Sequence, residues 1–363
     1  MKKILLIVII IIIFCSLPAA DTTLEWKRLV SNAPFLPRVF ASSAVYKGRL
    51  WLIGGGSSVY RAREFYNDVW YTSNGIDWVL ATGNAAFAPR ERHTTFVFDG
   101  KLWVVAGLLT SGTYCKDVWS SVDGVDWVLV TGNAAFDGRA GQVQTNMVLG
   151  NKMWIITGQN QKTGPVNDAW FSENGSDWFA ATRNTEFTGR SGLSGCVHDD
   201  KLWIGGGASA SSSVNDIWSS VDGEKWVQGG DIWPVEIQHP NIFSFHDKLW
   251  VLGGSRPGLD IQNYDRVQSS VDGKIWVYNS SGFGSHGASS LEVFNNMIYL
   301  MAGGAADNAR EQSALNDVWR AVYSSPTITP VHTLTVTVTP TQTMTLPIVA
   351  TEPVIKFTPT PDK

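Results

Sequence analysis

Arginines recur at one place in this chain, three residues after a phenylalanine and shortly before a predicted strand. Guanidinium groups hold carboxylates through two parallel hydrogen bonds. A ring of such arginines therefore predicts a site for an acidic ligand, such as an acidic peptide or a uronic or sialic acid. The candidate residues are Arg38, Arg90, Arg139 and Arg190, with His286 as a looser version and His239 near the same position in the fifth copy.

The same arginines allow a structural interpretation, in which each pairs with an aspartate of a neighbouring repeat. Matching aspartates stand in five copies, at Asp68, Asp117, Asp168, Asp216 and Asp317. Ion pairs within a fold are common, and a feature present in nearly every copy is more often architecture than recognition. Both interpretations are open at this point, and the structural one is favoured.

Segments that depart from the repeat form a second set of candidates, because loops on a rigid scaffold carry recognition. Segment 57–66 contributes Tyr60, Arg61, Arg63 and Tyr66, segment 255–266 contributes Arg256, and segment 305–314 is a third irregular loop. Trp233, close to Glu236, is the one tryptophan outside the repeat. Aromatic rings near arginines suit sugar rings or peptide anchors. Trp233 equally fits a packing role, in which it fills the space left by Gln268.

An internal repeat of about 50 residues positions these side chains, and three tryptophan positions define it. They are Trp26, Trp78, Trp127, Trp178, Trp226 and Trp276; Trp70, Trp119, Trp170, Trp218 and Trp319, with Gln268 in the fifth copy; and Trp51, Trp103, Trp154, Trp203 and Trp250, with Tyr299 in the sixth. Asn-Gly or Asp-Gly stands at 74–75, 123–124, 174–175, 222–223 and 272–273. These dipeptides predict hairpins with type I′ turns.

Each unit predicts four strands, and such units repeated every ~50 residues predict the blades of a β-propeller. The tryptophans are expected to pack between blades. The sixth copy lacks a fourth strand after "NDVWRAVYSS" (316–325), whereas "LEWKRLVSNAPFLPR" (24–38) supplies one at the start of the chain. We therefore predict an all-β fold, a six-bladed propeller over residues 21–325 whose N-terminal strand closes the last blade.

The unit resembles the kelch repeat, in which a Gly-Gly pair ends the second strand, the third strand reads "NDvW" and the fourth carries a tryptophan. Gly pairs stand at 54–55, 205–206, 253–254 and 303–304, with "AG" at 106–107 and "TG" at 157–158. The resemblance covers about residues 24–323 and implies a kelch-like or galactose-oxidase-like propeller, a scaffold of both binding proteins and enzymes. It also implies that the Phe-x-x-Arg arginines lie on the ligand-binding face, together with the loops between second and third strands.

Two catalytic functions are alternatives to a binding function. A galactose-oxidase-like copper site needs a Cys–Tyr crosslink and paired histidines, but Cys115 takes a core position of the repeat and Cys196 lies two repeats away. That separation also argues against a disulfide, which needs Cα atoms within about 7 Å. A sialidase-like site would draw on Arg38, Arg90, Glu64 and Tyr66, without the opening motif of that family. No metal-ligand spacing is present, so we assign no catalytic residue and expect no metal or cofactor.

Both ends of the chain differ from the repeat. Residues 1–20 combine two lysines, an apolar run and small residues, which predicts a signal peptide and a secreted or cell-surface protein without a membrane span in the mature chain. Residues 326–363 are rich in Thr and Pro, typical of a disordered, low-complexity stalk. Asn174 and Asn279 are acceptors for N-glycosylation in a host that has this pathway.

The overall charge narrows the class of partner. The formal net charge is −4 and no basic stripe is present, so nucleic acid is not an expected partner. The main hypothesis is an exported binding module for a protein or glycan ligand, with acidic ligands favoured by the arginines. The alternative is a carbohydrate-active enzyme on the same scaffold.

Overall fold

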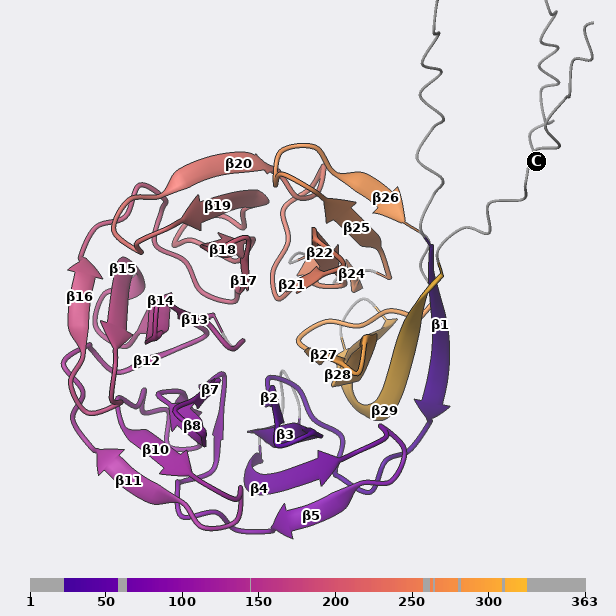
Figure 1. Cartoon of the computed structure of the whole chain (residues 1–363), viewed down its shortest axis with the longest axis horizontal. Coiled ribbons are helices and arrows are strands. Elements are labelled where there is room, and N and C mark those ends of the chain that lie inside the picture. Colours follow the sequence, from indigo (N-terminus) through magenta and orange to yellow (C-terminus); the bar gives the residue numbers. More distant parts are fainter. Residues whose placement is uncertain are drawn as a thin grey trace, which may run out of the picture. The chain divides into compact units, whose positions relative to one another are not determined.

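The computed structural model describes residues 23–57, 64–143, 145–256, 262–263, 265–279, 282–308 and 311–324. These residues form six antiparallel sheets around a central axis, and the described part of the chain contains no helix that could cross a membrane (Figure 1). The all-β, six-bladed propeller is therefore confirmed. The predicted signal peptide (1–20), the Thr/Pro-rich segment (326–363) and three candidate residues, Tyr60, Arg61 and Arg63, lie outside the described residues.

Four blades are regular, with strands ordered from the axis outward. Blade one is β2 (Ser42–Tyr46), β3 (Arg49–Gly56), β4 (Phe65–Thr72) and β5 (Val79–Thr82). Blade two is β7 (Thr94–Phe98), β8 (Lys101–Val105), β10 (Val118–Ser121) and β11 (Val128–Thr131). Blade four is β17 (Ser194–His198), β18 (Lys201–Gly205), β19 (Asp216–Ser220) and β20 (Val227–Asp231). Blade five is β21 (Asn241–Phe245), β22 (Lys248–Leu252), β25 (Val267–Ser270) and β26 (Val277–Asn279). Two short pairs are separate: β6 (Arg90–Glu91) with β9 (Leu108–Leu109), and β23 (Ser255–Arg256) with β24 (Gln262–Asn263).

Blade three departs from the predicted pattern at its inner strand. It consists of β12 (Arg139–Ala140), β13 (Val148–Leu149), β14 (Lys152–Asn160), β15 (Gly164–Ser172) and β16 (Phe179–Thr182). Between β12 and β13, polar side chains bond to neighbouring blades instead of extending the strand. Thr145 Oγ1 donates to the carbonyl of Gly195 (2.5 Å), and Asn146 Oδ1 accepts from the N–H of Val97 (3.1 Å).

Blade six joins the two ends of the propeller. It contains β27 (Ser290–Phe294), β28 (Met297–Asn308), β29 (Glu311–Ser324) and, as its outer strand, β1 (Thr23–Val30). Strand β1 runs antiparallel to β29, with Trp26 opposite Ala321, and Figure 1 shows the indigo β1 alongside the yellow-brown β29. The predicted closure by the N-terminal strand is confirmed. Because β1 pairs with β29, blade six has four strands like the regular blades and the edge of β29 is covered.

The loops between third and fourth strands are not the predicted type I′ turns. In blade two only Gly124 has a left-handed φ (77°), whereas both central residues of a type I′ turn need one. The Asp123 carboxylate accepts the N–H groups of Val125 and Asp126, each at 2.9 Å, and Ser121 Oγ accepts the N–H of Gly124 at 2.8 Å. These side-chain bonds hold a wider loop, residues 122–127, in place of a two-residue hairpin turn.

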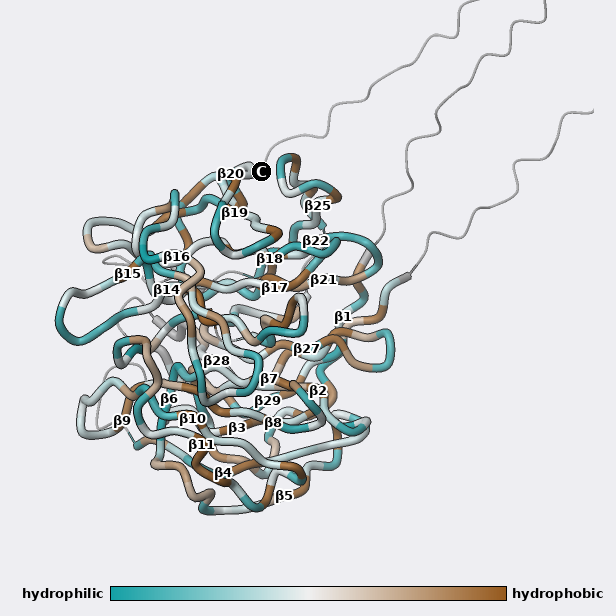
Figure 2. Tube along the Cα trace, turned by 60° about the vertical axis from the view of Figure 1, so that its left-hand side comes forward, coloured by the Kyte–Doolittle hydropathy of each residue, from teal (hydrophilic) through white to brown (hydrophobic). Residues whose placement is uncertain are grey.

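The second-strand tryptophans pack against the following blade, as predicted. Trp51 is 1 % exposed and lies over Gly124 of blade two, where any Cβ would collide with the indole ring. The equivalent contacts are Trp103 on Gly175, Trp154 on Gly223 and Trp203 on Gly273. The glycine of each of these Asx-Gly pairs therefore has two roles: it adopts the backbone conformation of the loop, and it leaves room for the indole ring at the interface between two blades. Figure 2 shows how hydrophobic and hydrophilic residues alternate along the trace, with hydrophobic stretches in many strands and hydrophilic stretches in many of the connecting loops.

The paired glycines occupy a different register from the one predicted in two blades. Every blade has two successive left-handed residues here, and in blades four and six they are Gly206–Gly207 and Ala302–Gly303, not 205–206 and 303–304. The second residue has φ between 94° and 119° in all six blades and is always glycine. At Gly55, for example, a Cβ would lie 2.9 Å from the Cβ of Ala41.

Candidate functional site

The four predicted arginines are buried in ion pairs. Arg90 Nη1 and Nη2 donate to Asp117 Oδ1 and Oδ2 at 2.7 and 2.8 Å, and Trp119 Nε1 donates to the same carboxylate at 2.8 Å. The equivalent pairs are Arg38–Asp68, Arg139–Asp168 and Arg190–Asp216, and all four arginines are at most 1 % exposed. The arginine and aspartate belong to the same blade, not to neighbouring blades as expected, because the arginine precedes the inner strand of the sheet that holds the aspartate.

The charge and the hydrogen bonds of each arginine–aspartate pair determine whether the arginine can bind a ligand. Burial raises the pKa of the Asp117 carboxyl, but the hydrogen bonds and charge of Arg90 more than offset it and leave the pKa below its usual value. Two further Arg90 donors are also used: Nη1 donates to the carbonyl of Ala106 and Nε to that of Ala88. Ligand binding by these arginines stays a prediction, and a ligand would have to displace an aspartate that is already paired with the arginine.

Blade six keeps a weaker form of the pair, and blade five has lost it. His286 Nε2 lies 3.2 Å from Asp317 Oδ1 in blade six. In blade five the arginine position is taken by Ile237, whose carbonyl accepts the N–H of Gly207 just as that of Arg190 accepts the N–H of Gly158. His239 therefore does not hold the arginine position in blade five, as the sequence suggested, but lies two residues beyond it.

The other two members of the motif are replaced in the same blade. Arg266 stands directly before Val267, where the aspartate stands in other blades, and Gln268 takes the place of the tryptophan. A carboxylate at this depth without its guanidinium would be an unpaired buried charge. Because the aspartate is replaced together with the arginine and the tryptophan, blade five avoids the free-energy cost of an unpaired carboxylate.

A ring of backbone hydrogen bonds surrounds the axis on the loop face, the end of the propeller that carries the loops between second and third strands. Five bonds run from blade to blade: Phe40 to Ala288, Arg92 to Phe40, Gly141 to Arg92, Gly192 to Gly141 and His239 to Gly192, at 2.7–3.1 Å between N and O. All six residues have left-handed φ between 52° and 66°. We call these six residues the axial collar. Their side chains share no chemistry, so sequence reasoning gave no signal for them as a set.

One side chain of the collar carries a charge. The Arg92 guanidinium lies over the Phe40 ring, 3.9 Å from its centroid, and the Phe40 ring meets that of His239 at 4.8 Å. Arg92 Nε also lies 3.3 Å from Oε1 of the buried Glu91, and the Arg92 side chain is 24 % exposed. Burial, with the charge of Arg92, lowers the pKa of His239 to about 3. His239 is therefore neutral near pH 7, and the positive charge of the collar belongs to Arg92.

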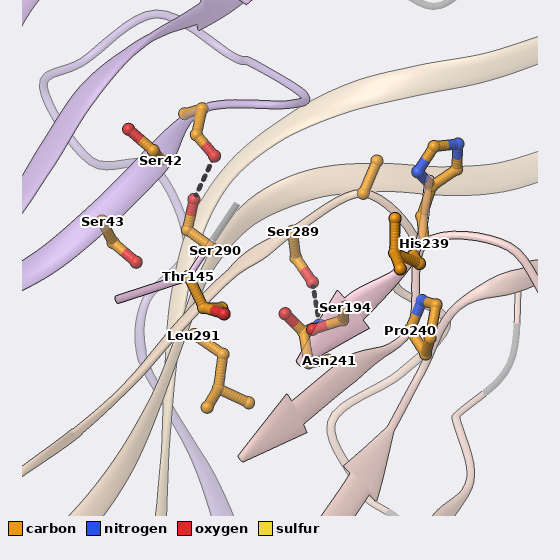
Figure 3. A pocket seen from close by; sticks show the side chains of 13 residues that line it. Ser42, Ser43, Thr145, Ser194, His239, Pro240, Asn241, Ser289, Ser290 and Leu291 are labelled. Carbon is orange, nitrogen blue, oxygen red and sulfur yellow. Dashed lines mark hydrogen bonds between the residues drawn. The ribbon is translucent and has the colours of Figure 1, made fainter. Parts of the chain in front are cut away.

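A small pocket of about 30 Å³ lies directly beneath the collar, lined mainly by hydroxyl groups (Figure 3). Ser290 Oγ donates to the carbonyl of Ala41 (3.0 Å), and Asn241 Nδ2 donates to Ser289 Oγ (2.9 Å). This volume suits a water molecule or two rather than a substrate.

A larger cavity of about 320 Å³ continues along the axis between the inner strands. Its lining includes Asn146, Cys196, Ser244 and Glu292, and we call it the axial cavity. Ser43 Oγ donates to Glu292 Oε1 at 2.9 Å. Burial raises the pKa of Glu292 to about 7, although the Ser43 hydrogen bond acts in the opposite direction.

One serine–histidine contact has the geometry of a nucleophile and its base. Ser42 Oγ lies 2.6 Å from Nε2 of His93. Burial and the charge of Arg90 lower the pKa of His93 to about 3, so its imidazole is a poor proton acceptor near neutral pH. Because Ser42 also contacts Thr95 Oγ1 at 2.5 Å and faces only the small pocket, the contact links blades one and two structurally.

The structure separates the remaining candidates. Trp233 is 2 % exposed and packs in a buried cluster with Ile232 and Ile237, so of the two interpretations left open for it the structure favours packing. Tyr66 is half-buried beneath the Arg38 guanidinium, 4.7 Å from its ring centroid, and burial raises its pKa. Arg256 ends strand β23, and its side chain lies outside the described residues.

The histidines and cysteines considered for a copper site, among them His198 and His246, do not form one cluster in the described part of the chain. His198 Nδ1 bonds to Ser244 Oγ (2.8 Å), whereas His246 stacks on Tyr323 with ring centroids 4.2 Å apart. Cys115 and Cys196 are free thiols, and burial raises the pKa of Cys115 to about 11. In the described ranges, no group of three His, Cys, Asp or Glu side chains could hold a metal ion.

The two glycosylation acceptors also differ in access. Asn174 is exposed in its loop, whereas Asn279 is 8 % exposed and its Nδ2 donates to Ser269 Oγ at 3.0 Å. Of the two, Asn174 alone presents its amide to solvent.

Comparison with known proteins supports the fold alone. No family model and no curated protein matches this chain. A solved structure titled "Structure of YjhT" is similar, with a TM-score of 0.65 and 14 % identity over 80 % of this chain and 96 % of that one. At this identity the likeness shows a shared β-propeller, a scaffold that is commonly a binding module.

Proposed function

We propose that this chain is an exported, kelch-like binding module that recognises a protein or carbohydrate ligand on the loop face, around the axial collar. The observation that carries the proposal is Arg92, the collar's charged side chain, which is partly exposed and lies over the Phe40 ring. A guanidinium stacked on an aromatic ring suits carboxylate-bearing peptides and acidic sugars. The collar's backbone bonds fix this platform rigidly, which lowers the entropy cost of binding.

Binding by the purified full-length product to glycan and acidic-peptide arrays tests this proposal. Arg92→Ala should weaken binding of an acidic ligand at least tenfold, the effect of losing about 1.4 kcal/mol. Arg183→Ala is the matched control, because Arg183 is an exposed arginine just beyond the outer strand of blade three. A folded Arg92→Ala variant that binds like the wild type would refute the collar as the binding surface.

Two further measurements address export and the enzyme alternative. The N-terminus of the mature protein should lie at or near Asp21, as determined by mass spectrometry of the secreted or surface fraction, because residues 1–20 have signal-peptide architecture. A protein retained inside the cell with Met1 intact would contradict export. Chemical change of a bound glycan during incubation would favour the carbohydrate-active enzyme over the binding module.

A further inference from the structure

The axial cavity contains a single acid among neutral neighbours. Glu292 lies in the middle of β27, and the other described residues of the cavity lining contribute amides, hydroxyls, the Cys196 thiol, backbone and apolar side chains. The lining comes from the inner strands of five blades, so the cavity follows the axis rather than one blade. Its volume of about 320 Å³ falls in the range of small-molecule sites.

Among the described residues, the Glu292 carboxylate accepts one hydrogen bond from a neutral donor and has no cationic partner. Ser43 donates to Oε1, and no described residue bonds to Oε2. The strands packed against β27 are β2, β3, β21 and β28, and the titratable side chains that the structure describes on them are Tyr46, Arg49 and Tyr299. Each has contacts elsewhere: the Tyr46 hydroxyl lies within hydrogen-bond distance of the carbonyls of Gly100 and Val122, Arg49 lies over the Tyr71 ring, and Tyr299 packs against Phe294.

A carboxylate removed from bulk water is normally paired with a cation, because its desolvation is otherwise uncompensated. The partly buried Glu292 carboxylate has no cationic partner among the described residues, yet it borders a cavity large enough for a small molecule. We propose that the axial cavity binds a small organic ammonium ion, with Glu292 as the counterion and Asn146 and Ser244 as hydrogen-bonding groups. This site goes beyond the loop-face function and does not depend on it.

The protonation of Glu292 gives the proposal a pH signature. Its pKa is raised to about 7 by burial, and only the ionised form attracts an ammonium group. Affinity should therefore rise about tenfold per pH unit below pH 7 and level off above it. Removing the Ser43 hydroxyl, which favours the ionised form, should move the midpoint to higher pH.

The test compares two probes of the same shape, tert-butylammonium and the neutral tert-butanol, titrated into the full-length protein and followed by NMR at pH 8. We expect the ammonium to bind at least tenfold more tightly than the alcohol. Glu292→Gln should abolish that difference, and Glu224→Gln, an exposed acid in a loop of blade four, should leave it unchanged. Thermal melting establishes that each variant is folded.

Three results would overturn the proposal: equal affinity for both probes, an undiminished preference for ammonium in folded Glu292→Gln, or no ammonium binding at pH 8. Should Glu292→Gln fail to fold, Ser43→Ala takes its place, because it keeps the carboxylate. That variant should shift the pH midpoint of ammonium binding upward, and an unmoved midpoint would also contradict the proposal.

Discussion

The guanidinium of Arg90 and the carboxylate of Asp117 meet through two parallel hydrogen bonds, and Trp119 donates a third to the same carboxylate. Each ion pair connects the segment before an inner strand to the start of the third strand of the same blade. The motif therefore stabilises the individual blade, and it recurs because the blades repeat. In blade five all three members of the motif are replaced together, whereas blade six keeps the aspartate and the tryptophan and has His286 in place of the arginine.

Asp117→Asn should lower the free energy of unfolding by about 3 kcal/mol, because it leaves the Arg90 charge buried without a partner. Urea denaturation at pH 7 measures the change, and Asp126→Asn, in an exposed loop position, is the control. The double variant Arg90→Met, Asp117→Asn should lose less than the sum of the single losses. Equal stability of the two single asparagine variants would argue against an energetic role for the pair.

Gly124→Ala should destabilise the protein by more than Gly100→Ala, because a methyl group at Gly124 collides with the Trp51 ring. Both glycines have a left-handed φ, 77° and 66°, but Gly100 has open space around its Cα. The Gly100 variant therefore measures backbone strain alone, about 1 kcal/mol. The difference between their unfolding free energies should be about 1–3 kcal/mol, typical of overpacking. Identical losses of unfolding free energy in the two variants would mean that the contact between Trp51 and Gly124 has no role in stability.

Deletion of residues 21–31 should yield aggregated or unfolded protein, because it removes β1 and exposes the edge of β29. Size-exclusion chromatography and far-ultraviolet circular dichroism of the purified product test this expectation. A soluble monomer with a cooperative thermal transition would contradict a structural requirement for closure.

Glu292→Gln should change the pH dependence of stability. The pKa of Glu292 rises from its ordinary 4.5 to about 7 on folding, so the folded state holds its proton more tightly than the unfolded state. The stabilising contribution is complete below about pH 4.5 and is lost as the pH rises to 7, by at most about 3 kcal/mol. The unfolding free energy of the variant relative to wild type should therefore increase between pH 5 and 8. A difference that stays constant over this interval would contradict the shifted pKa.

Much of the fold could be predicted because its signals are local. The spacing of Trp78, Trp127 and Trp178 and the fourth strand displaced to the N-terminus are visible without any contact being known. The errors arose where one pattern fits two conformations. Asp123-Gly124 reads equally well as a type I′ turn or as a side-chain-capped loop, and only the contact with Trp51 in another blade decides between them.

The candidate site was less accessible to sequence reasoning. The arginine pattern was visible, and so were the aspartates that turned out to hold it, but burial decides whether a guanidinium faces a ligand or a carboxylate. The collar residues Phe40, Arg92 and His239 share only a backbone conformation, imposed by hydrogen bonds between blades. Glu292 is one acid among many in the chain. Inner strands of five blades place it beside a cavity, without a counterion among the described residues, and this surrounding depends on residues far apart in the sequence.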